Sequence, residues 1–216
     1  MLRALLAFAA FAAVVTITPG LDTMLVVRTA AVSGRRAAFA TAGGIMLGCL
    51  AWAVASALGI TALLTASRVA YEVLRWAGAG CLCWLGLCYL GVRTLWRHRR
   101  PTAGEAPEPV AERSPGRAFR IGLTTNLLNP KVGVFYLSVL PQFLPHGVSP
   151  LLASTAMALV HNVEGLVWFT GLVFVVGRAA RLLSRPAVRR RLDQLTGVVF
   201  LAFGIRLAIQ GHRTSA

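Results

Sequence analysis

Charged side chains are scarce in this sequence of 216 residues. They make up 13% of the chain, whereas hydrophobic residues make up 56%. About a quarter of a soluble domain is charged, so this chain has too few charges to cover a water-facing surface. Acidic residues are the scarcest, with 7 against 22 lysines and arginines, which gives a formal net charge of +15. Because the arginines lie between apolar blocks and not along one helix face, we predict no nucleic-acid partner and an integral membrane protein within a lipid bilayer.

Cysteine is also rare. Its four copies, at Cys49, Cys81, Cys83 and Cys88, all lie inside apolar blocks, which argues against a secreted disulfide framework. Residues two apart on a helix point about 200° apart, and Cys81 and Cys88 are separated by about 10 Å along the axis. One helix therefore cannot close a thiolate site. We expect no metal and no cofactor, and read the cysteines as small apolar filler.

The motifs of intramembrane catalysis are missing as well. The sequence has no His-Glu-x-x-His, no Cys-x-x-Cys and no second aspartate in an apolar block opposite Asp22. A membrane-embedded protease or thiol oxidoreductase is therefore a weak hypothesis, and we predict that the protein is not an enzyme.

Six apolar stretches are long enough to cross a bilayer, which takes about 20 residues. They cover residues 2–27, 37–64, 69–96, 118–144, 150–176 and 188–210. The first resembles a signal peptide, but apolar character resumes after Pro19-Gly20, so we interpret it as a retained helix. The sequence predicts an all-α polytopic membrane protein with six transmembrane helices.

The segment 97–117 divides the chain into two halves of three helices, 1–96 and 118–216. It holds four prolines and three glutamates and is typical of a flexible linker. Because each half has an odd number of spans, the halves must enter the membrane from opposite sides. We therefore predict one transmembrane domain, 1–216, built from two inverted three-helix repeats.

The arginines set the orientation. Six spans place sixteen arginines on one side of the membrane, and these are Arg28, Arg35, Arg36, Arg93, Arg97, Arg99, Arg100, Arg113, Arg117, Arg120, Arg178, Arg181, Arg185, Arg189, Arg190 and Arg191. The other side receives five: Arg3, Arg68, Arg75, Arg206 and Arg213. The positive-inside rule makes the first side cytoplasmic, so both termini are expected outside the membrane.

The first helix of each half carries a proline-centred break, at Thr18-Pro19-Gly20 and at Asn129-Pro130. Proline removes a backbone donor, and lipid cannot satisfy the carbonyls that are freed. Such breaks in corresponding positions of two halves point to a transporter site near the midplane, although prolines also kink helices for packing alone. We expect the substrate-binding residues at the breaks: Pro19, Gly20, Asp22, Asn126, Asn129, Pro130 and Lys131.

Asp22 and Lys131 are the charges that suit an amino acid, which presents an ammonium and a carboxylate. Asp22 would face the amine or carry a proton, and Lys131 together with the half-helix N-terminus would face the carboxylate. The alternative is that the two side chains pair with each other. His161 and Glu164, one turn apart, suit a proton relay or a structural hydrogen-bonded pair. Gly43, Gly44 and Gly48 permit close helix contact, either within the chain or in a homodimer.

Several motifs together resemble those of the LysE/RhtB family of amino-acid exporters. They are Thr18-Pro19-Gly20 with Asp22-Thr23, Ser33-Gly34-Arg35-Arg36-Ala37, Ala77-Gly78 leading to Trp84-Leu85-Gly86, Phe119-Arg120 with Gly122, Asn126-Leu127-Leu128-Asn129-Pro130-Lys131 and Leu140-Pro141-Gln142-Phe143. The chain departs from the family at Leu21, where a second proline is usual, and in the polar run from His161 to Glu164.

The resemblance implies efflux of an amino acid or related metabolite across the plasma membrane, the inner membrane of a bacterium, with the proton-motive force as energy source and protons as partners. An exporter of a metal or other inorganic cation is the alternative. That alternative predicts several converging ligands, and only Asp22, His161 and Glu164 could contribute.

Overall fold

The structure is a computed structural model that describes residues 2–66, 68–90, 114–145, 147–175 and 186–210. Within these ranges the chain is helical and contains no β-strand, which confirms the all-α class. The elements are α1 (Leu2–Ile17), α2 (Leu21–Ala66), α3 (Arg68–Tyr89), α5 (Pro115–Leu127), α6 (Pro130–Val134), the π-helix η1 (Phe135–Val139), the 3-10 helix η2 (Leu140–Phe143), α7 (Pro150–Phe174) and α9 (Pro186–Gln210).

Helix α2 is two helical segments joined at Gly34, whose φ of 80° and ψ of 177° lie outside the helical region. Only glycine adopts such angles without strain. The predicted spans 2–27 and 37–64 are thus separated by this break, but helix extends beyond both predicted bounds to the residues next to Gly34. Arginine at the membrane surface sets topology, but it does not end a helix.

Three helical stretches in the described residues are long and apolar enough to cross a membrane: Leu21–Gly59, Pro150–Phe174 and Arg190–Ile209. The first has 39 residues and would span about 58 Å as a straight helix, about twice the hydrocarbon core. The break at Gly34 is what divides it. Leu2–Ile17 and Trp76–Tyr89 are shorter apolar helices.

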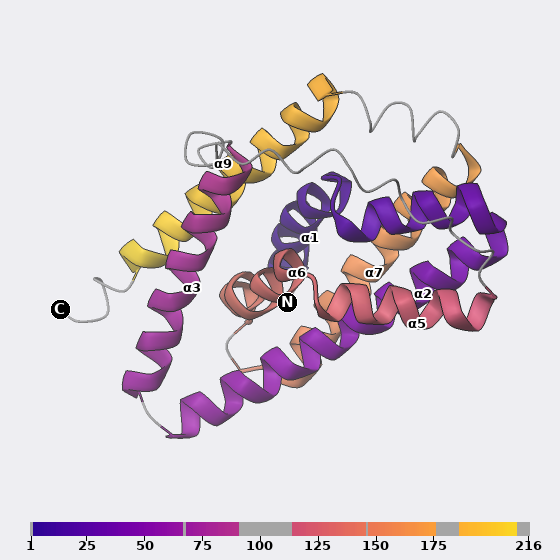
Figure 1. Ribbon diagram of the computed structural model, residues 1–216. Coiled ribbons are helices and arrows are strands. Elements are labelled where there is room, and N and C mark those ends of the chain that lie inside the picture. The colour runs from indigo at the N-terminus through magenta and orange to yellow at the C-terminus, as the bar shows by residue number, and fades with distance from the viewer. Residues whose placement is uncertain (1, 67, 91–113, 146, 176–185, 211–216) are drawn as a thin grey trace.

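The helices pack in two groups, as Figure 1 shows: α2 lies against α5 and α7, and α3 packs against α9. Glycines lie at the contacts in both groups. A methyl group added to Gly44 would meet the backbone of Phe119 on α5, and one added to Gly122 on α5 would meet the backbone of Thr41. In the second group, Gly86 of α3 lies against Gly197 of α9, where an added Cβ would be 2.8 Å from the carbonyl oxygen. The glycine-rich face of α2 thus packs within the chain.

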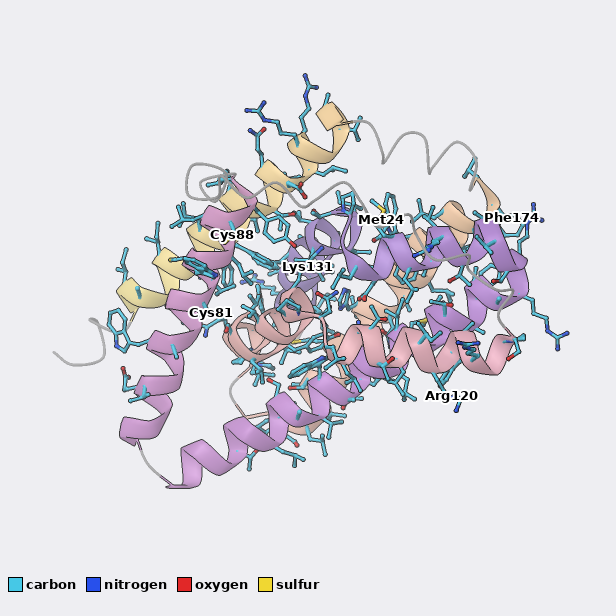
Figure 2. All side chains as sticks on the ribbon, in the orientation of Figure 1. Met24, Cys81, Cys88, Arg120, Lys131 and Phe174 are labelled. Carbon is cyan, nitrogen blue, oxygen red and sulfur yellow. The ribbon has the colours of Figure 1, made fainter. Side chains whose placement is uncertain are left out.

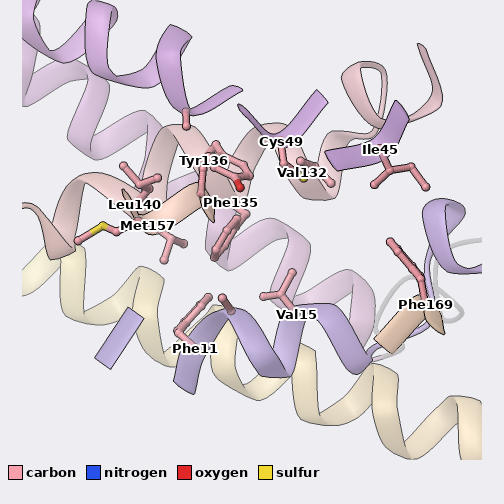
Figure 3. Close-up of a cluster of buried hydrophobic side chains, with 14 of the residues drawn as sticks. Phe11, Val15, Ile45, Cys49, Val132, Phe135, Tyr136, Leu140, Met157 and Phe169 are labelled. Atoms are coloured by element: carbon pink, nitrogen blue, oxygen red, sulfur yellow. The ribbon is translucent and has the colours of Figure 1, made fainter. Parts of the chain in front are cut away.

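Helix α1 and the α6–η2 segment lie between these two groups (Figure 1). Aromatic rings join them. Phe11 stacks on Phe135 of η1, with centroids 5.9 Å apart, and contacts Phe203 of α9 at 4.8 Å. Figure 3 shows the buried cluster around these rings, in which Val15, Cys49, Tyr136 and Met157 also take part. The core therefore surrounds the broken helices.

Parts of the predicted organisation lie outside the described residues. These are most of the linker 97–117, the end of the third predicted span at 91–96, and the chain beyond residue 210. Residues 176–185 also lie outside, with the end of the fifth predicted span and with Arg178, Arg181 and Arg185. The last part of the predicted linker is described, and there α5 begins at Pro115, three residues before the predicted start of the fourth span.

Candidate substrate-binding site

Two helix breaks meet in the middle of the molecule. Helix α1 ends at Ile17 and α2 begins at Leu21, while α5 ends at Leu127 and α6 begins at Pro130. The polar side chains at the breaks are buried, namely Thr18, Asn126, Asn129 and Lys131. Figure 2 shows Lys131 among the central helices, whereas Arg120 lies away from them, on α5. The breaks therefore concentrate polar groups inside an otherwise apolar structure.

Lys131 crosses from α6 to the end of α1. Its Nζ donates to the carbonyl oxygens of Val15, at 2.7 Å, and Thr18, at 3.0 Å. The last carbonyls of a helix have no partner within it, and they form the negative end of its dipole. The ammonium therefore satisfies carbonyls that lipid could not, and two of its three N–H groups are used in doing so.

Asn129 caps the start of α6. Its Oδ1 accepts from the Lys131 backbone N–H at 3.1 Å, and its carbonyl oxygen accepts from Val132 and Gly133. Pro130 is at the first helical position, where its missing N–H costs nothing. The backbone donors at this helix start are thus already used within the chain.

Asp22 lies in the first turn of α2 and bonds to the other break. Asn126 Nδ2 donates to its Oδ2 at 2.8 Å and contacts Cys49 Sγ at 3.6 Å. The second carboxylate oxygen, Oδ1, and the amide oxygen of Asn126 are buried without a hydrogen-bond partner in the described structure. A buried acceptor left unpaired is costly, so these two oxygens are suited to receive donors from a ligand.

A cavity of about 50 Å³ opens beside these groups. Its walls include Asp22, Asn129 and Lys131 from the breaks, with Cys49 of α2 and His161 and Asn162 of α7 opposite. Gly20 also lines it. The volume accommodates only a few waters, so an organic ligand would have to widen the site.

His161 bonds to Tyr136, not to Glu164. The Tyr136 hydroxyl lies 2.9 Å from His161 Nδ1, and both residues are buried. Glu164 is half-buried and its Oε2 has no hydrogen-bond partner among the described residues. Of the two residues predicted as a relay, only His161 lines the cavity next to Asp22.

The sequence matches the family described as LysE type translocator over residues 13–211, which is most of its length. The chain belongs to this family. It is 33% identical to the threonine efflux protein of Escherichia coli strain K12, over 97% of this chain and 99% of that protein. It is 28% identical to the homoserine/homoserine lactone efflux protein of Salmonella typhimurium, over 91% of this chain and 92% of that protein.

A membrane protein of Bacillus subtilis strain 168, YrhP, is 24% identical over 96% of this chain and all of its own length. No solved structure matches the chain. Family membership makes the protein a membrane transporter.

In this LysE type translocator the structure adds polar residues that the sequence did not single out as ligands. Cys49, Tyr136 and Asn162 all lie at the site, and Asn162 Nδ2 donates to the Met46 carbonyl at 3.1 Å. Thr18 bonds back to Val14 at 2.7 Å and also contacts Thr196 of α9. One signal was available for Asn162, because it follows His161 inside an apolar helix.

Proposed function

We propose that this LysE type translocator exports an amino acid or a closely related metabolite, in the class of threonine and homoserine. The observation that carries the proposal is the presence of two oppositely charged side chains at the facing breaks, half-buried Asp22 and buried Lys131, next to a common cavity. The names of its efflux relatives support the same substrate class over an inorganic cation.

Each of the two charges would bind one of the charged groups of the amino acid. The ammonium of an amino acid would donate to Asp22 Oδ1, the oxygen that lacks a partner, and to Asn126 Oδ1 beside it. Its carboxylate would accept from the third N–H of Lys131, since the other two are held by Val15 and Thr18. Charge-assisted hydrogen bonds in a buried site are the strong ones, so this arrangement selects a zwitterion.

We propose further that six membrane-spanning helices form two inverted repeats. Equivalent helices of the two halves would then meet about a pseudo-two-fold axis. The packing of α2 with α7, of α3 with α9 and of the two breaks supports this arrangement. So does Arg35, whose guanidinium stacks on the Phe174 ring at 4.7 Å, since both residues belong to predicted cytoplasmic ends.

In this proposal the arginine-rich ends face the cytoplasm of a bacterial inner membrane, and both termini lie outside it. Export is driven by the proton-motive force. The groups that could carry a proton are Asp22 and the Tyr136–His161 pair at the site, and Glu164 one turn along α7 from His161. Carboxyl groups and histidines inside a membrane are common elements of proton pathways.

Direct efflux from loaded proteoliposomes tests the function. Purified protein is reconstituted with radiolabelled threonine or homoserine inside, and release is followed with and without an imposed pH gradient. The proposal expects gradient-stimulated release of at least one of the two. If neither is released while Zn²⁺ or another divalent cation is, the cation alternative is correct.

Single replacements test the site. Asp22→Asn and Lys131→Met each remove one charge with little change in size, and we expect either to lower kcat/KM for efflux by two or more orders of magnitude. Glu72→Gln is the matched control, because Glu72 lies near the start of α3 and lines neither the cavity nor the breaks. Normal efflux by the double Asp22→Ala, Lys131→Ala variant would show that these residues do not bind substrate.

A further inference from the structure

A second cavity lies on the other face of the breaks. Its volume is about 290 Å³, against about 50 Å³ for the cavity beside Asp22. Gly20, Asn129 and Lys131 line both cavities, so these residues form the wall between them. The far wall of the second cavity comes from the paired helices α3 and α9, through Leu85, Tyr89 and Asp193.

Among the described residues, one carboxylate lines each cavity. Asp22 lines the first and Asp193 the second, and Lys131 lines both. Both carboxylates attract the Lys131 ammonium electrostatically. The Lys131 ammonium donates two hydrogen bonds to the carbonyl oxygens of Val15 and Thr18, which leaves its third N–H for a ligand. The lysine is thus placed to serve a ligand on either side.

The second cavity also has the chemistry that an amino acid requires. Asp193 lines it with a carboxylate, whose negative charge suits an ammonium. Lys131 provides a donor for a carboxylate, and Leu85 and Met24 provide an apolar wall for a short side chain. Sites for small molecules combine an apolar lining with a few polar groups in this way. Unlike the cavity beside Asp22, it has a volume in the range of a small organic molecule.

We infer that the Asp193 cavity is a second amino-acid site, which shares Lys131 with the Asp22 site. This inference rests on the proposed function. Lys131 holds the substrate carboxylate in both positions, whereas the ammonium passes from Asp193 to Asp22. With the orientation proposed above, Tyr89 and Asp193 belong to the cytoplasmic ends of α3 and α9, so the cavity receives the substrate before the Asp22 site does.

Substitution of Asp193 tests the inference in proteoliposomes loaded with radiolabelled threonine or homoserine. Asp193→Asn removes the charge that binds the ammonium, so KM should rise about tenfold or more, with a smaller change in kcat. Asp193→Glu should restore most of the affinity. Glu72→Gln, which removes an acid outside both cavities, should leave KM unchanged.

Met24→Phe provides a second variant that narrows the same cavity from α2 without changing charge. It should also raise KM. If Asp193→Asn and Met24→Phe both keep the KM of the Glu72→Gln control, the inference is wrong. The proposed function fails separately, and only if the unmodified protein releases neither amino acid.

Binding gives a readout that does not depend on transport. Threonine should raise the thermal unfolding temperature of the detergent-solubilised protein. The rise should shrink in Asp22→Asn and in Asp193→Asn and disappear only in the double variant, because two sites contribute. Complete loss of the rise in Asp22→Asn alone would mean that there is a single site and would overturn the inference.

Discussion

Gly48→Ala should damage the substrate site through packing alone. Gly48 lies on α2 where Asn126 of α5 approaches it, and an added Cβ would be 2.9 Å from Asn126 Cγ and 3.0 Å from its Cβ. Asn126 is fully buried and donates to Asp22 at 2.8 Å. The methyl group must therefore push α2 from α5 or turn the amide away from Asp22.

The size of the effect follows from these contacts. Overpacking of a close interface costs about 1–3 kcal/mol of unfolding free energy. Loss of the bond between Asn126 and Asp22, which is a hydrogen bond to a charged group, costs about 1.5–3 kcal/mol. If the contribution of the Asn126–Asp22 hydrogen bond, about 1.5–3 kcal/mol, is lost from the substrate-bound state, kcat/KM for efflux falls roughly 10- to 150-fold, since about 1.4 kcal/mol is a factor of ten.

The matched control lies on the same helix. A Cβ added to Gly59 would meet nothing within 4 Å, so Gly59→Ala should leave efflux unchanged and stabilise the helix by about 0.5–1 kcal/mol. Both variants are assayed for efflux in proteoliposomes and for unfolding free energy by titration with SDS in micelles, followed by tryptophan fluorescence. Equal stability and equal efflux in the two variants would refute the assignment of Asn126 to the site.

Three further predictions test other contacts. Lys131→Arg keeps the charge but cannot place a compact ammonium between two carbonyls, so efflux should fall at least tenfold in vesicles, and wild-type kinetics would contradict the geometry. Tyr136→Phe leaves His161 Nδ1 without its partner, so unfolding free energy should fall by about 1 kcal/mol in the SDS titration. No change there would mean that the bond is not formed in the native protein. Gly86→Ala places a Cβ 2.8 Å from a backbone oxygen of α9, so it should lower the unfolding free energy by about 1–3 kcal/mol. In the control Gly80→Ala the added Cβ meets nothing within 4 Å, so the unfolding free energy should not fall. An unchanged unfolding free energy in Gly86→Ala would mean that α3 and α9 are further apart than in the structure.

The sequence was sufficient for the all-α class and for both helix breaks. Apolar stretches of sufficient length predict helices in lipid, and Pro19 and Pro130 mark the breaks because proline cannot continue the backbone hydrogen bonding. It was insufficient at Gly34. The arginines around that residue indicate a membrane surface, and this says nothing about whether the backbone stays helical.

The partners at the site could not be predicted. Asp22 and Asn126 are 104 residues apart in the chain, and Lys131 bonds to backbone carbonyls, which leave no trace in the side-chain pattern. In the sequence Tyr136 resembles an ordinary aromatic residue of the core, and only the structure shows that its hydroxyl contacts His161. Asp193 follows a run of arginines that the sequence explains by topology, so only the cavity draws attention to it.

The glycine contacts of the two helix groups also limit how the transporter can move. Where backbones touch, as α2 and α5 do at Gly44 and α3 and α9 do at Gly86, sliding by even a fraction of an ångström meets main-chain atoms. Each group should therefore travel as a rigid body. Transport requires a rearrangement that exposes the substrate to one side of the membrane and then to the other. We expect this rearrangement in the segments between the two groups, α1 and α6–η2, because they make contact through aromatic rings that can shift against one another. Lys131 on α6 would then move relative to Asp22 of α2 and Asn126 of α5, so the proposed site would change shape between a moving segment and a rigid group.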